Sequence, residues 1–374
     1  MSIEIKKIST NADLTKFIKF PYKIYSGNKY WCPPLHSDEK QTLRKDKNPA
    51  FEFCESEYWL AYKGTESVGR IAGIINHKAN KRWNEQLVRF GWIDFIDDPE
   101  VSGKLIETVE NWGKEKGMKG IHGPLGFSDM DNEGMLIYGF NELATISSIY
   151  NHPYYPEHFQ KMGFLKAADW MQFEITITPI IPEKFIKMAA LVEQKYNLHV
   201  VKVKKAKELI PYARKMFIML NEAFDDLYGY SQLSEKQMDI YIKKYFGFIR
   251  PEFVSLVLDT NDDVIGFGIS LPSLTTALQR CKGKLFPFGF LHLLKAFKRN
   301  HFVDMALVGV RPDYQTKGVL AMVYRDLHKS YTDYNILKAT TNPQLEDNVK
   351  ALSIWKNFEG RQHIRRRCWI KNFN

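Results

Sequence analysis

The short polar loop at residues 311–318 is the part of this chain whose residue types and spacing most clearly suggest chemistry. An apolar run over residues 305–310 leads into the loop and stops at Pro312, which has no backbone N–H to give to a central strand. Apolar residues at helical spacing predict a helix directly after Gly318. A strand, a glycine-containing loop and a helix N-terminus together offer backbone N–H groups and a positive dipole end to an anion. A pyrophosphate is the ligand that this arrangement favours.

The spacing within the loop separates it from other phosphate-binding loops. Its pattern, Gln315-x-x-Gly318-x-Leu320, has neither the Gly-Lys-Ser/Thr of the Walker loop nor the three glycines of the dinucleotide fingerprint. It resembles the acetyl-CoA-binding loop of the GNAT acyltransferases, Gln/Arg-x-x-Gly-x-Gly/Ala, although Leu320 replaces a small residue. The resemblance implies that CoA contacts the loop and the end of the strand before it, at Val308, Val310, Gln315, Thr316, Lys317, Gly318, Val319 and Leu320.

A second pattern of that family follows a strand that we expect at 334–339. In the family a helix carries Asn-x-x-Ala-x-x-x-Tyr, and here Asn348 and Ala351 match while Trp355 replaces the tyrosine. An indole N–H cannot protonate a leaving thiolate, so we expect Trp355 to be a core aromatic residue. The resemblance implies that Asn348 contacts CoA or holds a water molecule.

Acyl transfer from a thioester to an amine needs a base, a donor to the carbonyl oxygen and an acid for the thiolate. Glu346 lies just ahead of the Asn348 helix and is our first candidate for the base, with an ordinary glutamate near a helix start as the alternative. Tyr155 is a candidate acid, provided that the N-terminal half closes over the site. Asn348 completes the predicted catalytic set.

The sequence predicts no metal site. Asp129, Asp131 and Glu133 could bind an amine or a metal, but a solvated loop is the simpler interpretation. The four cysteines lie far apart without ligand spacing, which favours reduced thiols and a cytoplasmic protein. We also expect no signal peptide and no membrane span, because no apolar run reaches about 18 residues.

Length and charge set the broad class. A chain of 374 residues suits two domains, and an aromatic content of 14% can fill two cores. The 53 basic and 43 acidic residues give a net charge of +10, which suits an anionic partner such as CoA, nucleic acid or an acidic lipid surface.

The two halves repeat one order of elements, which indicates an internal duplication. We expect strands at 58–62, 67–75, 88–95 and 121–123 in the first half, and at 253–258 and 264–271 in the second. The predicted domains are a degenerate N-terminal one, 1–180, and a C-terminal one, 181–374. We equate residues 100–105 with the loop at 315–320. Asp97, Asp98 and Glu100 would repel a phosphate there, so we expect only the C-terminal half to bind CoA.

Several short sequence segments extend the resemblance to nearly the whole chain. They include Tyr30-Trp31-Cys32-Pro33-Pro34, Gly123-Pro124-Leu125-Gly126 and Tyr150-Asn151-His152-Pro153. Together they look like a double-length bacterial GNAT-related family, some members of which are linked to ceramide synthesis. The resemblance implies an α/β (α+β layered) fold of two tandem GNAT-like domains, with mixed, mostly antiparallel sheets flanked by helices. It also implies an enzyme, an acyl-CoA-dependent N-acyltransferase that moves an acetyl or longer acyl group to a primary amine, which is a long-chain lipid amine in the ceramide-linked members.

Residues 282–301 mix large apolar with basic side chains. Such a stretch suits peripheral contact with a membrane, and the alternative is a packed lid whose apolar face belongs to the core.

Two other functions stay open. Tandem units of this kind also occur in aminoacyl-tRNA-dependent transferases of the peptidoglycan-bridge type, which would use Arg365, Arg366 and Arg367 to bind tRNA. These arginines alternate faces if they lie on a strand, however, and we expect no nucleic-acid partner. Leu320 and Trp355 also leave room for a non-catalytic lipid- or protein-binding module.

Overall fold

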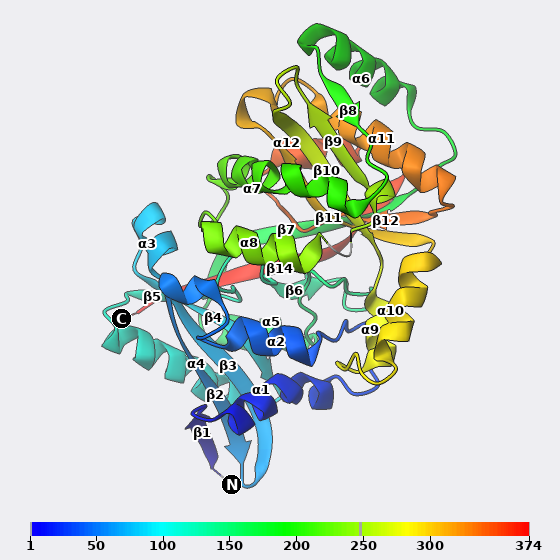
Figure 1. Cartoon of the computed structure of the whole chain (residues 1–374). Helices are drawn as coiled ribbons and strands as arrows, with labels where there is room; N and C mark the ends of the chain where they lie inside the picture. The colour runs from blue at the N-terminus through cyan, green and yellow to red at the C-terminus, as the bar shows by residue number, and fades with distance from the viewer. Residues whose placement is uncertain (1, 247–248, 374) are drawn as a thin grey trace. The chain divides into compact units, whose positions relative to one another are not determined.

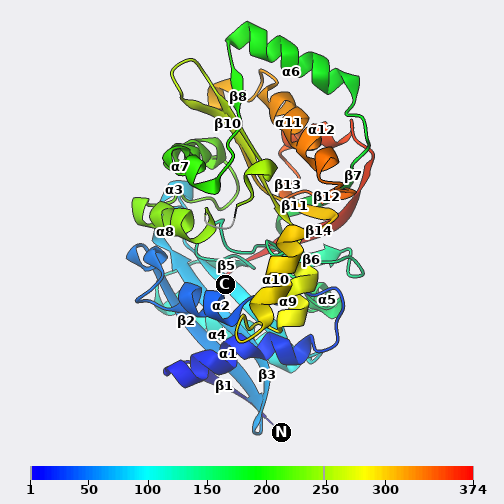
Figure 2. The same cartoon turned by 45° about the vertical axis from the view of Figure 1, so that its right-hand side comes forward.

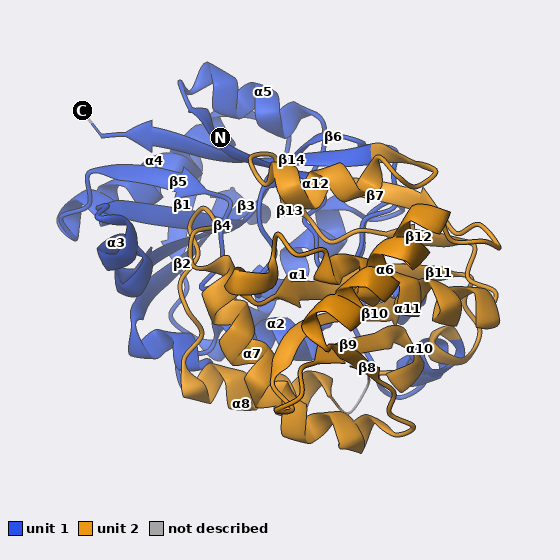
Figure 3. Ribbon diagram, turned by 90° about the horizontal axis from the view of Figure 1, so that it is seen from above, with its two compact units in different colours: residues 1–171, 274–295, 363–374 blue, residues 172–273, 296–362 orange. Residues whose placement is uncertain are grey.

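A computed structural model describes residues 2–246 and 249–373 of the chain (Figure 1). The chain forms two compact units (Figure 3). Unit 1 comprises residues 1–171, 274–295 and 363–374, and unit 2 comprises residues 172–273 and 296–362. Each unit holds its own run of neighbouring strands, which we call its sheet, and its own hydrophobic core.

Unit 1 is built on a sheet in which β1 to β4 are antiparallel neighbours and β5 lies parallel to β4. The last part of β14 then pairs antiparallel with β5 and with β6. The strands are β1 (Ile3–Lys7), β2 (Cys54–Lys63), β3 (Glu66–Asn76), β4 (Leu87–Phe95), β5 (Gly120–Gly123), β6 (Met135–Tyr138) and β14 (Gly360–Asn372).

Helices cover both faces of this sheet. α4 packs Val101, Leu105 and Val109 against one face, and α1 packs Phe17 and its apolar neighbours against the other. The helices of this part are α1 (Asn11–Ile24), α2 (His36–Leu43), α3 (His77–Trp83), α4 (Pro99–Glu115), α5 (Tyr154–Lys161), α9 (Thr275–Cys281) and α10 (Gly289–Lys298). The last turn of α10 passes into unit 2.

Unit 2 repeats the same order of strands. β8 to β11 are antiparallel neighbours, β12 lies parallel to β11, and residues 174–176 of β7 pair antiparallel with β12. The strands are β7 (Leu165–Thr176), β8 (His199–Val201), β9 (Val254–Leu258), β10 (Val264–Pro272), β11 (Phe302–Val310), β12 (Lys338–Thr340) and β13 (Gln344–Leu345).

The helices of unit 2 divide between the two faces of its sheet. α6 lies along α11, and both contribute to one core together with α12 (Figures 1 and 2). α7 packs against β10 and β11, and α8 packs against α7. The bounds are α6 (Glu183–Tyr196), α7 (Ile210–Phe224), α8 (Glu235–Tyr245), α11 (Val319–Asp333) and α12 (Val349–Trp355).

The sixth strand of each sheet comes from the other half of the sequence. Residues 172–176 complete the sheet of unit 2, and residues 363–372 complete the sheet of unit 1. The predicted α/β fold and the internal duplication are confirmed, and the division into 1–180 and 181–374 stays a prediction about the repeats along the chain. The strand predicted at 334–339 is wrong in its bounds. Asn335 has a left-handed backbone in the turn after α11, so the strand begins only at Lys338.

Candidate functional site

The strands β11 and β12 of unit 2 separate after a short stretch of pairing. They are neighbours from Phe302 to Asp304 on β11, which then continues to Val310. A bulge follows directly: Ser270 of β10 lies opposite Met305, and Ile269 lies opposite Leu307, so that Ala306 is the extra residue. A bulge bends its strand and increases its twist, and this favours the separation of β11 from β12.

Backbone N–H groups of β11 point into this opening. Arg311, the residue after the strand, donates its N–H to the carbonyl of Ile265 on β10 at 2.9 Å. Successive N–H groups of a strand point to opposite edges, so those of Val310 and Val308 point toward β12. The two residues that the resemblance implies for CoA therefore present donors to the opening.

The loop after β11 ends in a helix N-terminus without a side-chain cap. Gly318 is the N-cap of α11, it has a left-handed backbone (φ 82°), and the first turn of the helix holds no acidic residue. Glycine adopts this conformation without the penalty that a Cβ brings. The N–H of Ala321 bonds to the Gly318 carbonyl. The other N–H groups of the first turn can point to an anion.

The other predicted loop residues lie around this terminus. The Gln315 amide reaches back toward the Val310 carbonyl at 3.4 Å, and the Lys317 ammonium lies 3.9 Å from the centre of the Tyr314 ring. Thr316 is exposed, Val319 is buried, and Leu320 packs at the edge of the core. Of the two cations in the loop, Arg311 pairs with Asp313, whereas Lys317 lies next to Gly318 in the chain.

Asn348, Glu346 and Trp355 are all in unit 2, as the second pattern implies. The Asn348 side chain caps α12 by accepting the N–H of Ala351 at 3.2 Å, and Glu346 lies half-buried between β13 and α12. Trp355 is only 4% exposed, and its indole N–H donates to the Gln344 side chain at 2.8 Å. The expectation of a core aromatic at this position is confirmed.

Asp304 is a functional candidate that the sequence reasoning missed. It lies at the last paired position before β11 and β12 separate, and it is only 6% exposed. Burial raises its carboxyl pKa to about 7, although a hydrogen bond from Ser273 lowers it in part. Within the described part of the chain, its Oδ2 has no hydrogen-bond partner. The sequence held one sign of it: a single aspartate in an otherwise apolar strand, where this residue type is disfavoured.

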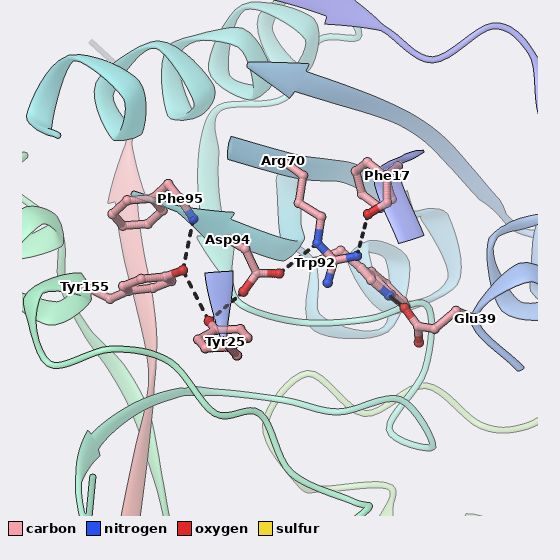
Figure 4. A network of polar contacts seen from close by, with 8 residues as sticks. All are labelled: Phe17, Tyr25, Glu39, Arg70, Trp92, Asp94, Phe95 and Tyr155. Carbon is pink, nitrogen blue, oxygen red and sulfur yellow. Dashed lines mark hydrogen bonds and ion pairs between the residues drawn. The ribbon is translucent and has the colours of Figure 1, made fainter. Parts of the chain in front are cut away.

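The corresponding opening of unit 1, between β4 and β5, is filled from within. The N–H of Ile96 bonds to the Val68 carbonyl, which matches the bond of Arg311 in unit 2. The N–H of Phe95, equivalent to that of Val310, points into the opening and donates to the Tyr155 hydroxyl at 2.9 Å (Figure 4). The Tyr155 ring stacks on Phe95 at 4.0 Å between centroids.

A buried polar network holds Tyr155 in this place (Figure 4). The hydroxyl of Tyr25 lies 3.2 Å from that of Tyr155 and donates to Asp94 at 2.7 Å, and Arg70 pairs with the other oxygen of Asp94 at 2.7 Å. Burial, reinforced by the charge of Asp94, raises the pKa of Tyr155. Tyr155 is thus a protonated interior residue of unit 1, whereas every other predicted site residue is in unit 2.

Unit 1 also lacks a phosphate loop. Only residues 96–98 separate β4 from α4, and the Asp98 carboxylate caps this helix by accepting the N–H of Glu100 at 3.0 Å. Residues 100–105, which we equated with the loop at 315–320, belong to the body of α4, so that equivalence is wrong. The loop is absent from unit 1 because Pro99 and the Asp98 cap start the helix at once.

The fold matches solved structures. A tandem GNAT protein from the clavulanic acid biosynthesis pathway superposes with a TM-score of 0.57 at 10% identity, over 99% of this chain and 98% of that one. The chain is a tandem GNAT-fold protein. A GCN5-related N-acetyltransferase from Sphaerobacter thermophilus superposes with a TM-score of 0.53, over 99% and 95% of the two chains.

Two curated proteins resemble this tandem GNAT-fold chain in sequence. Protein YghO of Escherichia coli is 28% identical over 310 residues, which is 81% of this chain and 77% of that protein. The bacterial ceramide synthase of Caulobacter vibrioides is 26% identical over 320 residues, 84% of this chain and 82% of that protein. No protein-family model matches the chain.

Acidic residues of the tandem GNAT-fold chain gather after β5 in unit 1. The Asp131 carboxylate accepts the N–H groups of Phe127 and Ser128. Burial raises the carboxyl pKa of Asp129 to about 7 and also raises that of Glu133. Asp129, Asp131 and Glu133 are half-buried and Asn132 is exposed, so the predicted solvated loop is solvated only in part. Across the described residues, no three His, Cys, Asp or Glu side chains are placed to hold a metal ion.

Proposed function

We propose that this tandem GNAT-fold protein transfers an acyl group from acyl-CoA to a primary amine, and that unit 2 binds the acyl-CoA. The contrast between the two units carries the proposal. At equivalent places, unit 2 has an opening lined by strand N–H groups and an uncapped helix start at Gly318, whereas unit 1 has Tyr155 and the Asp98 cap. A free helix N-terminus attracts phosphates, and a carboxylate cap repels them.

The two ends of the opening suit different parts of acyl-CoA. The pyrophosphate would lie at Gly318 and the first turn of α11, with Lys317 close by. The N–H groups of Val308 and Val310 would hold the extended chain and polarise the thioester carbonyl, which lowers the barrier for attack on it. Met188 and Val192 of α6 lie beside Gly318 and would line this end.

The structure offers a base for this reaction at Asp304. Val303 and Met305 pack into the same core as α11, so Asp304 between them points to the opposite face of the sheet. An acyl-CoA held at the start of α11 would approach the sheet from the α11 face. The amine would then attack from the opposite face, where Asp304 points. The carboxylate would take one proton from the ammonium, and the amine nitrogen would bond to the thioester carbon as the C–S bond breaks. The CoA thiolate would leave and take up the second proton that the nitrogen loses.

Glu346, Asn348 and Tyr155 keep separate roles in the proposal. Glu346 stays the second candidate base, and Asn348 positions the start of α12 near the donor. Tyr155 was the predicted acid, and that role stays a prediction. Its contacts with Phe95 and Tyr25 give it a structural task in unit 1.

The acceptor that we propose is a long-chain lipid amine. This assignment rests on the similarity to a protein that is named a bacterial ceramide synthase. We also propose a cytoplasmic setting, because the structure has all four cysteines as thiols.

The three consecutive arginines at 365–367 do not support a tRNA-dependent transferase. Arg365 and Arg367 both pair with the buried Asp169, and Arg366 is buried on the other side of β14, with its Nε donating to the carbonyl of Ile149. The arginines alternate faces as expected and serve the interior of unit 1. No described feature of this cluster therefore favours tRNA as a substrate.

The test combines binding and turnover on the full chain. Calorimetry should detect binding of CoA and of palmitoyl-CoA at one site, and product analysis should find the amide of a long-chain amino alcohol with one thiol released per amide. Thiol release without amide would show hydrolysis only and contradict the proposed acceptor. Binding without any release would make the protein a lipid- or protein-binding module, and absence of binding would overturn the proposal.

A further inference from the structure

The segment from residue 282 to 299 contains an unusual exposed apolar surface. The preceding helix α9 buries Thr275, Ala277, Leu278 and Cys281, whereas α10 buries none of its residues. The alternative that we weighed for this segment, a packed lid with its apolar face in the core, requires buried side chains on α10. The structure does not have them.

The loop before α10 is fixed to the rest of unit 1. The N–H of His36 on α2 donates to the Gly283 carbonyl at 3.0 Å, and a Cβ at Gly283 would lie 2.2 Å from the Tyr22 hydroxyl. Within the loop, the N–H of Phe290 bonds to the Leu285 carbonyl at 2.8 Å. Outward side chains on such an anchored loop are held at the surface by the backbone.

The outward side chains are large and apolar. Phe286 is 78% exposed and Phe288 72%, values that soluble surfaces rarely give to phenylalanine. We call these two together with their apolar neighbours on α10 the phenylalanine surface, which consists of Phe286, Phe288, Phe290, Leu291 and Leu294.

Only positive charge surrounds the phenylalanine surface along the chain. Between Asp263 and Asp304 the sequence has no acidic residue and six basic ones, Arg280, Lys282, Lys284, Lys295, Lys298 and Arg299. All six of them are exposed. Exposed aromatic rings bordered by lysine and arginine match the interface of an anionic bilayer, where rings enter the acyl boundary and ammonium groups stay among the phosphates.

We infer that the phenylalanine surface docks on anionic lipid bilayers and holds the protein at the membrane surface. The inference does not rest on acyl transfer, because it needs only the exposed side chains and their charge. None of the described helices has the length and apolarity needed to span a bilayer, so the contact would be peripheral. The partner is a lipid surface and not a nucleic acid, because the exposed side chains of Leu291 and Leu294 are aliphatic and suit an acyl boundary.

Vesicle flotation of the full chain tests this inference. The wild type should float with phosphatidylcholine vesicles that contain about a third phosphatidylglycerol, and much less with phosphatidylcholine alone, since each lysine near an anionic surface adds attraction. The double variant F286S/F288S should bind at least about tenfold more weakly, because burying one phenyl ring is worth roughly that factor. The variant K295E/K298E should lose the preference for phosphatidylglycerol and keep weak binding.

A matched control uses exposed apolar residues elsewhere. Leu165 is 71% exposed and Ile180 79%, so L165S/I180S removes similar apolar surface at other places and should float as the wild type does. Circular dichroism melts check that every variant is folded. Equal flotation of F286S/F288S and the wild type would overturn the inference. So would a wild-type dimer in sedimentation velocity that F286S/F288S abolishes, because the surface would then bind a second copy.

Discussion

At the scale of single residues, the two units differ most at the start of one helix. α11 begins at Gly318 with no side-chain cap, and α4 begins at Asp98, whose carboxylate occupies the N–H groups that a phosphate would use. A helix N-terminus can satisfy its first N–H groups with its own side chain or with a ligand, but not with both. One residue type at this position therefore distinguishes the unit that we propose to bind acyl-CoA from the other unit.

Gly318→Asp should reduce CoA affinity at least about a hundredfold, because a carboxylate would cap α11 and repel the pyrophosphate. Gly318→Asn keeps the left-handed strain and the contact of the new Cβ with Met188, yet adds no charge, so it should lose much less affinity. Gly103 is half-buried in the body of α4 with open space for a Cβ, and Gly103→Asp is a control that should leave CoA affinity unchanged. Calorimetry with CoA compares all three, and an unchanged affinity in Gly318→Asp would contradict the site.

Asp304 should set the pH dependence of acyl transfer. With a pKa of about 7, the carboxyl is protonated and inactive as a base in acid, so kcat should rise to a plateau above pH 7. Asp304→Asn should lower kcat by about a hundredfold or more, flatten this rise and leave palmitoyl-CoA affinity unchanged. If Asp304→Asn keeps the wild-type pH profile, Glu346 becomes the leading candidate, and Glu346→Gln is the comparison.

The same residue should affect stability in a defined pH window. Its folded pKa lies above its ordinary value of 3.8, so between about pH 4 and pH 7 the unfolded chain loses a proton that the folded chain retains. The free energy of unfolding should therefore fall as pH rises through this window, by on the order of a few kcal/mol. Urea unfolding at pH 4.5 and 7.5 should show this fall to be larger in the wild type than in Asp304→Asn. Equal falls in both proteins would mean that Asp304 is not held protonated.

At the scale of elements, α5 does in unit 1 what a ligand would do in unit 2. It places Tyr155 in the opening between β4 and β5, where the tyrosine accepts the Phe95 N–H and stacks on its ring. The bulge of β4 near Trp92, with its left-handed backbone, has its counterpart at Ala306 of β11. The duplicated strands therefore keep the same opening, and the connecting helices decide whether it stays available.

The variant Tyr155→Phe tests whether the Tyr155 hydroxyl has a structural or a catalytic role. Loss of the hydroxyl leaves the Phe95 N–H buried without its acceptor, so the variant should be less stable by about 1–3 kcal/mol. Its kcat and CoA affinity should stay within about twofold of the wild type, since a folded core tyrosine takes no part in proton transfer. Urea unfolding and turnover are measured on the same preparation. A large fall in kcat without a loss of stability would restore Tyr155 as the acid.

At the scale of the whole molecule, the exchange of strands binds the two halves of the sequence together. Residues 363–372 carry Ile364, Cys368 and Trp369 into the interior of unit 1, and each of these is at most 2% exposed. Removing one large buried aromatic side chain costs about 3–5 kcal/mol, a large share of the stability of a domain. We therefore predict that the repeats 1–180 and 181–374 are not independent folding units.

Fragment 1–180 should not fold alone, because it lacks the strand that covers β5 and leaves that edge exposed. Its circular dichroism melt should show no cooperative transition. Fragment 1–180 joined through a flexible linker to residues 360–374 should recover one, and this is the matched control. A cooperative melt of fragment 1–180 by itself would show that the exchanged strand is dispensable.

Much of the fold could be predicted because it follows from local patterns of apolar and turn residues. The strands of unit 1 and the helix after Gly318 follow from alternation, periodicity and turn residues, and all of these act within a few residues of chain. The equivalence of residues 100–105 with the loop at 315–320 was wrong because it considered only the spacing of residues. Pro99 and the Asp98 cap start a helix before residue 100. Asp304 was missed because a single aspartate in an apolar strand does not by itself show that the carboxylate is buried.

The sequence by itself determined the helix that starts after Gly318, the core role of Trp355 and the acid-free stretch around the phenylalanine surface. Each depends on neighbours along the chain, whose geometry the backbone fixes. Only the tertiary structure decided that unit 1 fills its own opening, that the sixth strands are exchanged and that Asp304 is desolvated. These three depend on contacts between residues far apart in sequence, such as Phe95 with Tyr155 and Gly123 with Trp369, and such contacts form only when the chain packs.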